Sequence, residues 1–196
     1  MSDVVQFDPR TRLLKLTNSR NILLILGILQ VGMHAVVLYT LPRGVEREPD
    51  FPESIVWEYM TTLVPAGQVR DTRTYFRQME EKEPEKYKEL YEKAREELKI
   101  ERETMRAVLL ERAPIVSWSG VACGTFTLFA ALLLPWMAGG LSVLAALAFL
   151  GFMGVQLYQF GAGGLLNGIV FYIVAMVMYF YASRLALEAE TGIRVK

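Results

Sequence analysis

The sequence predicts an all-α integral membrane protein with four transmembrane helices and a helical extramembrane loop between helices 1 and 2. Four apolar stretches are each long enough to cross a hydrocarbon core about 30 Å thick, which takes roughly 20 helical residues. The 21 Lys plus Arg and 21 Asp plus Glu residues are segregated, so that residues 21–41 and 114–183 contain no charged side chain. A soluble fold of 196 residues has too little interior to bury four such helices. Lipid is therefore the expected solvent for most apolar side chains.

The stretches divide the chain into five parts. These are a cytoplasmic or interfacial tail at 1–20, a first transmembrane helix at 21–41, an extramembrane loop at 42–113, a three-helix transmembrane hairpin bundle at 114–187 and a C-terminal tail at 188–196. Ser19 is suited to be the N-cap of the first helix. The bundle helices are expected at 114–136, 141–160 and 165–187. Glycine turns at 139–140 and 161–164 are so short that consecutive helices must be antiparallel.

The loop at 42–113 divides into two regions. Its first part contains Pro42, Pro49, Pro52 and Pro65, which favour irregular chain, with a short amphipathic helix near 53–64. Its second part begins at Pro84, which suits the first turn of a helix. Opposite charges then recur at helical spacing, which predicts a long charged helix at 84–112.

One face of the 84–112 helix is apolar, and two interpretations of it stand. The face carries Tyr87, Tyr91, Leu98 and Met105. In the favoured interpretation it packs on residues 53–76 of its own loop. In the other it docks on a partner protein outside the membrane.

The distribution of basic residues predicts the orientation. The N-terminal tail carries Arg10, Arg12, Lys15 and Arg20, whereas a loop longer than about 60 residues largely escapes the positive-inside rule. We therefore expect both termini in the cytoplasm and loop 42–113 outside, in a bacterial plasma (inner) membrane. The aromatic residues expected at the loop-side boundary are Tyr39, Trp118 and Tyr158, and those expected at the opposite boundary are Trp136, Tyr179 and Tyr181.

Polar residues inside the spans converge on the loop-side half of the bundle. The candidate intramembrane site consists of Gln30, His34, Ser119, Gln156, Gln159 and Asn167. The favoured interpretation is hydrogen bonding between helices, roughly 0.6–2 kcal/mol for each bond in a membrane. The alternative is a quinone, haem or pigment site with His34 as donor or ligand.

Small residues predict close helix packing at two steps. Gly120 and Gly124 lie four apart in the second span, and Gly164 and Gly168 lie four apart near the start of the last. Glycines at this spacing let two helix backbones approach closely.

Motifs for chemistry are absent from the sequence. It has no Walker-type glycine loop, no HExxH and no GxSxG. The single His and the single Cys, Cys123, exclude an intrachain disulfide and leave no metal-ligand spacing. Lys and Arg in the loop alternate with Glu, so nucleic-acid binding is not expected. We expect no catalytic residue, no metal and no cofactor.

These observations favour a non-catalytic multi-pass subunit. It would sit in the lipid bilayer, pack against other membrane protein subunits and dock a partner through loop 42–113 in an assembly, scaffold or accessory role. One alternative is a homo-oligomeric channel or transport component. A second is a quinone-, haem- or pigment-associated subunit that uses His34.

Overall fold

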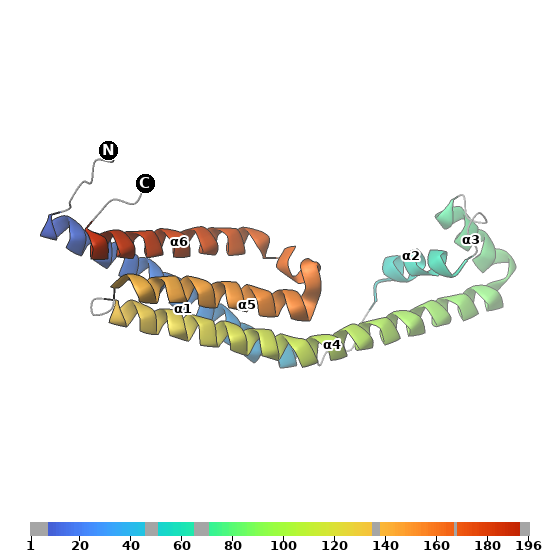
Figure 1. Cartoon of the computed structure of the whole chain (residues 1–196). Coiled ribbons are helices and arrows are strands. Elements are labelled where there is room, and N and C mark those ends of the chain that lie inside the picture. The colour runs from blue at the N-terminus through green and yellow to red at the C-terminus, as the bar shows by residue number, and fades with distance from the viewer. Residues whose placement is uncertain (1–7, 46–50, 65–70, 135–137, 167, 193–196) are drawn as a thin grey trace. The chain divides into compact units, whose positions relative to one another are not determined.

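A computed structural model of the chain describes residues 8–45, 51–64, 71–134, 138–166 and 168–192. Its helices, in chain order, are α1 (Pro9–Val45), α2 (Glu53–Leu63), α3 (Thr72–Lys82), α4 (Pro84–Leu133), α5 (Ala138–Leu166) and α6 (Ile169–Thr191) (Figure 1). No strand occurs in the described ranges. Helices α1, α4, α5 and α6 are long and apolar enough to cross a membrane. The prediction of an all-α chain with four such helices is confirmed.

The chain divides into two compact units. The first unit comprises Met1–Pro42 and Glu111–Lys196, and the second comprises Arg43–Leu110. Helix α4 begins in the second unit and ends in the first. The predicted irregular chain around Pro49 and Pro65 lies outside the described residues.

Helix α1 begins at Pro9, well before the predicted start at Asn21. The reason is a cap: the backbone N–H of Thr11 donates to Asp8 Oδ1 at 2.9 Å, and Pro9 occupies the first helical position, where its missing N–H costs nothing. This hydrogen bond, together with a second from the Thr11 hydroxyl, lowers the pKa of the Asp8 carboxyl. The prediction that Ser19 is an N-cap is wrong, because Ser19 lies inside α1 and its hydroxyl donates to the Ala182 carbonyl oxygen at 2.8 Å.

Helix α4 also crosses a predicted boundary. The segments expected at 84–112 and 114–136 form one helix that continues through Pro114. A proline inside a helix removes one backbone hydrogen bond and strains the preceding turn, but membrane helices often accommodate that loss. The helix therefore does not end where the charged sequence changes to an apolar one.

The glycine turns also differ from the prediction. Gly139 and Gly140 lie in the first turn of α5, which begins at Ala138. Gly161 is a kink inside α5, with φ 64° and ψ −166°. An L side chain rarely adopts that positive φ, so glycine is required there.

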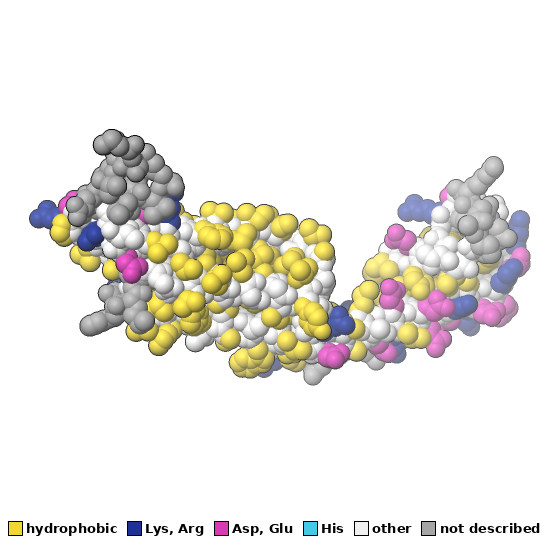
Figure 2. All heavy atoms as spheres, in the orientation of Figure 1, with side chains coloured by type: hydrophobic (Ala, Val, Ile, Leu, Met, Phe, Trp, Pro, Cys, Tyr) yellow, Lys and Arg dark blue, Asp and Glu magenta, His cyan; other side chains and the backbone are white. Residues whose placement is uncertain are grey.

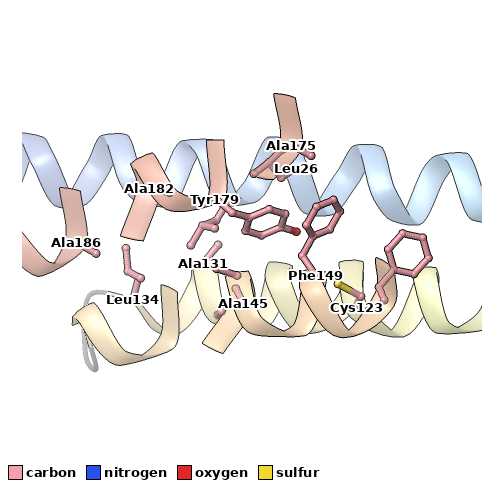
Figure 3. Packing of buried hydrophobic residues seen from close by; sticks show 14 of the residues in the cluster. Leu26, Cys123, Ala131, Leu134, Ala145, Phe149, Ala175, Tyr179, Ala182 and Ala186 are labelled. Carbon is pink, nitrogen blue, oxygen red and sulfur yellow. The ribbon is translucent and has the colours of Figure 1, made fainter. Parts of the chain in front are cut away.

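The first unit is a four-helix bundle with an interior of small and aromatic side chains. Its buried cluster draws on all four helices and includes Leu26, Ala131, Ala145, Phe149 and Tyr179 (Figure 3). Large apolar side chains also cover the visible outer face of this unit (Figure 2). The bundle is thus apolar both inside and outside, as a helix bundle in lipid is.

The second unit has a separate small core. Val56 and Met60 of α2, Phe76 of α3 and Ala94 of α4 are fully buried together. Tyr87, Tyr91 and Leu98 pack against this core and are partly buried, as are residues of α2 such as Trp57 and Tyr59. Three of the four predicted docking residues therefore contact their own loop, as in the favoured interpretation. Met105 is 59% exposed.

Candidate functional site

A buried polar centre lies where the four helices of the first unit meet. The Tyr179 hydroxyl oxygen of α6 lies 2.9 Å from Thr127 Oγ1 of α4 and 3.2 Å from Gln30 Oε1 of α1. The Tyr179 ring stacks on Phe149 of α5, with ring centroids 4.9 Å apart (Figure 3). Each of these four residues is at most 2% exposed. Tyr179 thereby contacts one side chain from every other helix of the bundle.

The hydrogen bonds of this centre form a directed chain. Thr127 donates its hydroxyl proton to the Cys123 carbonyl oxygen at 2.9 Å, so it accepts from Tyr179. The single phenol proton of Tyr179 is then used on Thr127. Gln30 Nε2 is buried with no hydrogen-bond partner among the described residues. Turning the Gln30 amide so that Nε2 faces the phenol oxygen supplies that donor and completes the chain.

Two glycines bring α1 and α4 close enough to form this centre. A methyl group on Gly124 would lie 3.0 Å from the Val31 nitrogen and 3.1 Å from the Gly27 carbonyl oxygen. A methyl group on Gly27 would lie 3.0 Å from the Gly124 carbonyl oxygen. The two helices therefore touch through their backbones, which is the arrangement that small residues permit in membrane bundles.

His34 lies one turn after Gln30 along α1 and is half-buried. Its ring packs edge-on against Phe152, with centroids 5.0 Å apart and an interplanar angle of 72°. The ring also lies over Gly120, where a side chain would collide with the imidazole. Gly120 thus makes room for His34, while Gly124 allows the backbone contact.

Gln156 belongs to a different polar group at the kinked end of α5. It accepts a hydrogen bond from the Tyr172 hydroxyl, and its Nε2 donates to the Gly164 carbonyl oxygen at 3.4 Å. Phe152 is buried and packs against both His34 and Tyr172. An aromatic side chain therefore separates Gln156 from His34 within the expected polar patch.

The remaining predicted residues make backbone contacts. The Gln159 carbonyl oxygen accepts from Arg112 Nη1 at 2.9 Å. Ser119 donates to the Val116 carbonyl oxygen at 2.7 Å within its own helix. Asn167 lies outside the described residues. The structure thus divides the five predicted residues that it describes among several sites and does not unite them in one.

The glycine step at Gly164 and Gly168 differs from the prediction. Helix α5 ends at Leu166 and α6 begins at Ile169, so the two glycines do not lie on one helix. The nearest side chains are Phe160 for Gly164 and Tyr172 for Gly168, each four residues away in sequence. Gly164 and Gly168 therefore lie on either side of the connection between α5 and α6.

Tyr179 and Thr127 were not among the predicted site residues. Tyr179 was expected among the aromatic residues of the membrane boundary, and its side chain is instead directed into the bundle, where it is buried. A signal was present in the sequence: Ala175, Tyr179, Ala182 and Ala186 follow helical spacing, and all four are buried. A single tyrosine in a face of alanines is typical of a packed helix contact. Trp136, expected at the same boundary, lies outside the described residues.

A charged group joins the ends of α1 and α6. The Glu188 side chain is 5% exposed, and its two oxygens contact Lys15 and Arg184. The Arg184 Nε to Glu188 Oε1 distance is 3.1 Å. The buried carboxylate is therefore balanced by two cations, and the three side chains together carry one net positive charge.

Polar contacts in the second unit hold α2 on α4. The Trp57 indole N–H donates to the Tyr87 hydroxyl at 2.9 Å, and the Tyr59 hydroxyl donates to Glu97 Oε2 at 3.3 Å. Burial raises the pKa of Tyr87. The phenol is therefore neutral at ordinary pH and accepts the indole proton without a charge.

No protein-family model, curated protein or solved structure matches this chain. Within the described ranges, no group of three or more His, Cys, Asp or Glu side chains is arranged to hold a metal ion. Proposals about function therefore depend on the contacts described above.

Proposed function

We propose that this chain is a non-catalytic multi-pass membrane subunit that packs into a larger membrane protein complex. The observation that carries the proposal is that the buried polar side chains of the bundle form hydrogen bonds between its helices. The Tyr179 hydroxyl is hydrogen-bonded to both Thr127 and Gln30, and all three side chains are buried. Groups engaged in this way connect helices, and they leave no exposed reactive atom at the centre of the bundle.

The surface of the bundle supports a location in lipid. Side chains such as Leu132, Val170 and Phe180 are large, apolar and exposed. A soluble monomer rarely exposes contiguous apolar area of this extent. Basic residues in the N-terminal tail favour an orientation with both termini in the cytoplasm and loop 42–113 outside, and we propose a bacterial plasma membrane as the location.

The second unit offers a docking surface that differs from the one first expected. Tyr87, Tyr91 and Leu98 are covered by α2 and α3, so they are unsuited to hold a partner. Met105, Val108 and Leu109 are exposed and lie within about 100° of one another around α4. We propose that this face, here named the α4 docking face, contacts another membrane subunit.

The first test concerns the membrane. A surfactant-free lysate is cleared by ultracentrifugation, and the pellet is washed with alkaline carbonate. The chain is expected to stay in the washed pellet, since four apolar helices hold it in lipid. Folded, monodisperse protein in the supernatant would overturn the proposal.

The second test concerns the partner. Affinity purification in mild detergent with mass analysis is expected to recover a second membrane protein. The double variant Met105→Glu and Leu109→Glu should reduce its recovery about tenfold, because loss of about 1.4 kcal/mol of binding has that effect. Ile100→Glu is the matched control, since Ile100 is 56% exposed and lies on another side of α4.

Three results of this purification count against the proposal. Equal recovery of the second protein with the double variant and with the unchanged chain would show that the α4 docking face does not bind it. A homo-oligomer with no second protein would favour the channel or transport alternative. A coloured preparation whose visible absorption is lost in His34→Ala would favour the haem or pigment alternative.

A further inference from the structure

A polar pocket lies between α2 and α3, entirely within the second unit. Its volume of about 630 Å³ is in the range of pockets that hold small ligands. Its lining comprises two hydroxyl residues, the indole of Trp57 and four charged side chains, Glu53, Arg73, Arg77 and Glu80. The pocket is therefore suited to a charged, water-soluble ligand.

Two arginines, Arg73 and Arg77, line the pocket from α3 and are here named the arginine pair. Both are exposed, and they lie four residues apart on one side of the helix. Neither forms an ion pair with a carboxylate of the described residues; the pKa of nearby Asp71 is lowered by the Thr74 hydroxyl first and by Arg73 last. Like charges at this spacing repel one another. An anion shared between the two guanidinium groups would remove that repulsion through charge-assisted hydrogen bonds.

Two carboxylates, Glu53 and Glu80, line the same pocket and are here named the acidic pair. Burial raises the pKa of Tyr87, and the charges of Glu80 and Glu53 raise it further, so both carboxylates lie near its hydroxyl. That hydroxyl accepts the Trp57 indole N–H at 2.9 Å, which brings the indole to the same place. Carboxylates beside an aromatic ring suit an ammonium group, which binds to both.

The spacing of the charges indicates the length of the ligand. The arginine pair is centred five positions before Glu80 in the sequence, which is about 7.5 Å along α3. Since each residue of an extended chain spans about 3.3–3.6 Å, a peptide of two or three residues separates its charged ends by this distance. A free amino acid does not, because its ammonium and carboxylate groups are bonded to one carbon.

We propose that this pocket binds a short peptide of about two or three residues by its two charged ends. The carboxylate lies on the arginine pair, the ammonium lies at the acidic pair, and a side chain packs on the Trp57 ring. This inference goes beyond the packing role proposed above, because it gives the second unit a small ligand of its own.

The test is a calorimetric titration of the purified full-length chain in mild detergent with the tripeptide alanyl-phenylalanyl-alanine. Acetylation of its amine or amidation of its carboxylate removes one charged end at a time. Each modification is expected to weaken binding about tenfold, as loss of one charged hydrogen bond does. Free phenylalanine should bind about tenfold or more weakly than the tripeptide, because it cannot reach both pairs.

Two variants assign the ends of the peptide to the two pairs. Arg77→Gln should make binding insensitive to amidation, and Glu80→Gln should make it insensitive to acetylation. Arg95→Gln and Glu92→Gln are the matched controls, because both residues are exposed on α4 and lie outside the pocket. All four positions are exposed, so the variants are expected to fold, and far-UV circular dichroism checks that they do.

Four results would overturn the inference. They are no heat of binding with the tripeptide, equal binding of the free and blocked tripeptides, equal binding of free phenylalanine, or the same losses in the control variants as in the pocket variants. The titration uses the isolated chain, so its result is independent of whether a second membrane protein co-purifies.

Discussion

Replacing Gly124 by alanine tests the backbone contact between α1 and α4. The added methyl group would lie 2.8 Å from Val31 Cγ2, 3.0 Å from the Val31 nitrogen and 3.1 Å from the Gly27 carbonyl oxygen. Two of these atoms are backbone, and the valine side chain is stiff because it branches at Cβ. The contact can relax only if the two helices move apart.

The magnitude follows from two opposing effects. Overpacking a well-packed interior costs about 1–3 kcal/mol, while alanine favours a helix interior over glycine by about 0.5–1 kcal/mol. Gly151→Ala isolates the second effect, because Gly151 lies inside α5 with no atom within 4 Å of the added methyl. Gly124→Ala is therefore expected to be about 1–3 kcal/mol less stable than Gly151→Ala.

Unfolding in mixed micelles of increasing sodium dodecyl sulfate, followed by circular dichroism, measures this difference. Comparing the two alanine variants cancels the helix preference that they share. If both unfold at the same sodium dodecyl sulfate fraction, α1 and α4 do not touch through Gly124, and the account of how Gln30 and Thr127 both reach the Tyr179 hydroxyl fails.

Three further predictions concern hydrogen bonds and charge. Tyr179→Phe should lower stability by about 0.6–2 kcal/mol, and a double-mutant cycle with Gln30→Leu should show coupling, whereas strict additivity would mean that the two side chains do not interact. Lys15→Met should cost about 1–3 kcal/mol by leaving Glu188 under-compensated, and adding Glu188→Gln should recover part of the loss; no recovery would contradict the ion pair. Because burial raises the pKa of Tyr87 above its usual value of 10.0, its contribution to stability should be constant below about pH 10 and decline above it. Thermal unfolding of the full chain at several pH values tests this, and Tyr87→Phe should flatten that decline.

Hydropathy could predict which helices are long and apolar, but it could not predict where they begin. The apolar run starts near Asn21, yet α1 starts at Pro9. Hydropathy reports which solvent suits the side chains, whereas a helix begins where the first backbone N–H groups find acceptors. The Asp8–Pro9 pair carried that second signal.

The candidate site was predictable only in part, for a related reason. Gln30 could be identified because a polar residue within an apolar stretch requires a partner. Its partner Tyr179 could not be identified from the sequence, because the two residues are 149 positions apart. Tyrosine is also common both in protein cores and at membrane boundaries. The Lys15–Glu188 pair, separated by 173 residues, escaped detection because nothing local in the sequence links them.

The separation of Gln30 and Tyr179 along the chain has a consequence for biosynthesis. They are 149 residues apart, and a ribosome adds about 5–20 residues per second, so Tyr179 is made about 7–30 s after Gln30. In the membrane role proposed above, the first helix spends that interval without the Tyr179 partner of its Gln30 amide. An insertion factor or a sister subunit has those seconds in which to hold the nascent chain before its last helix closes the bundle.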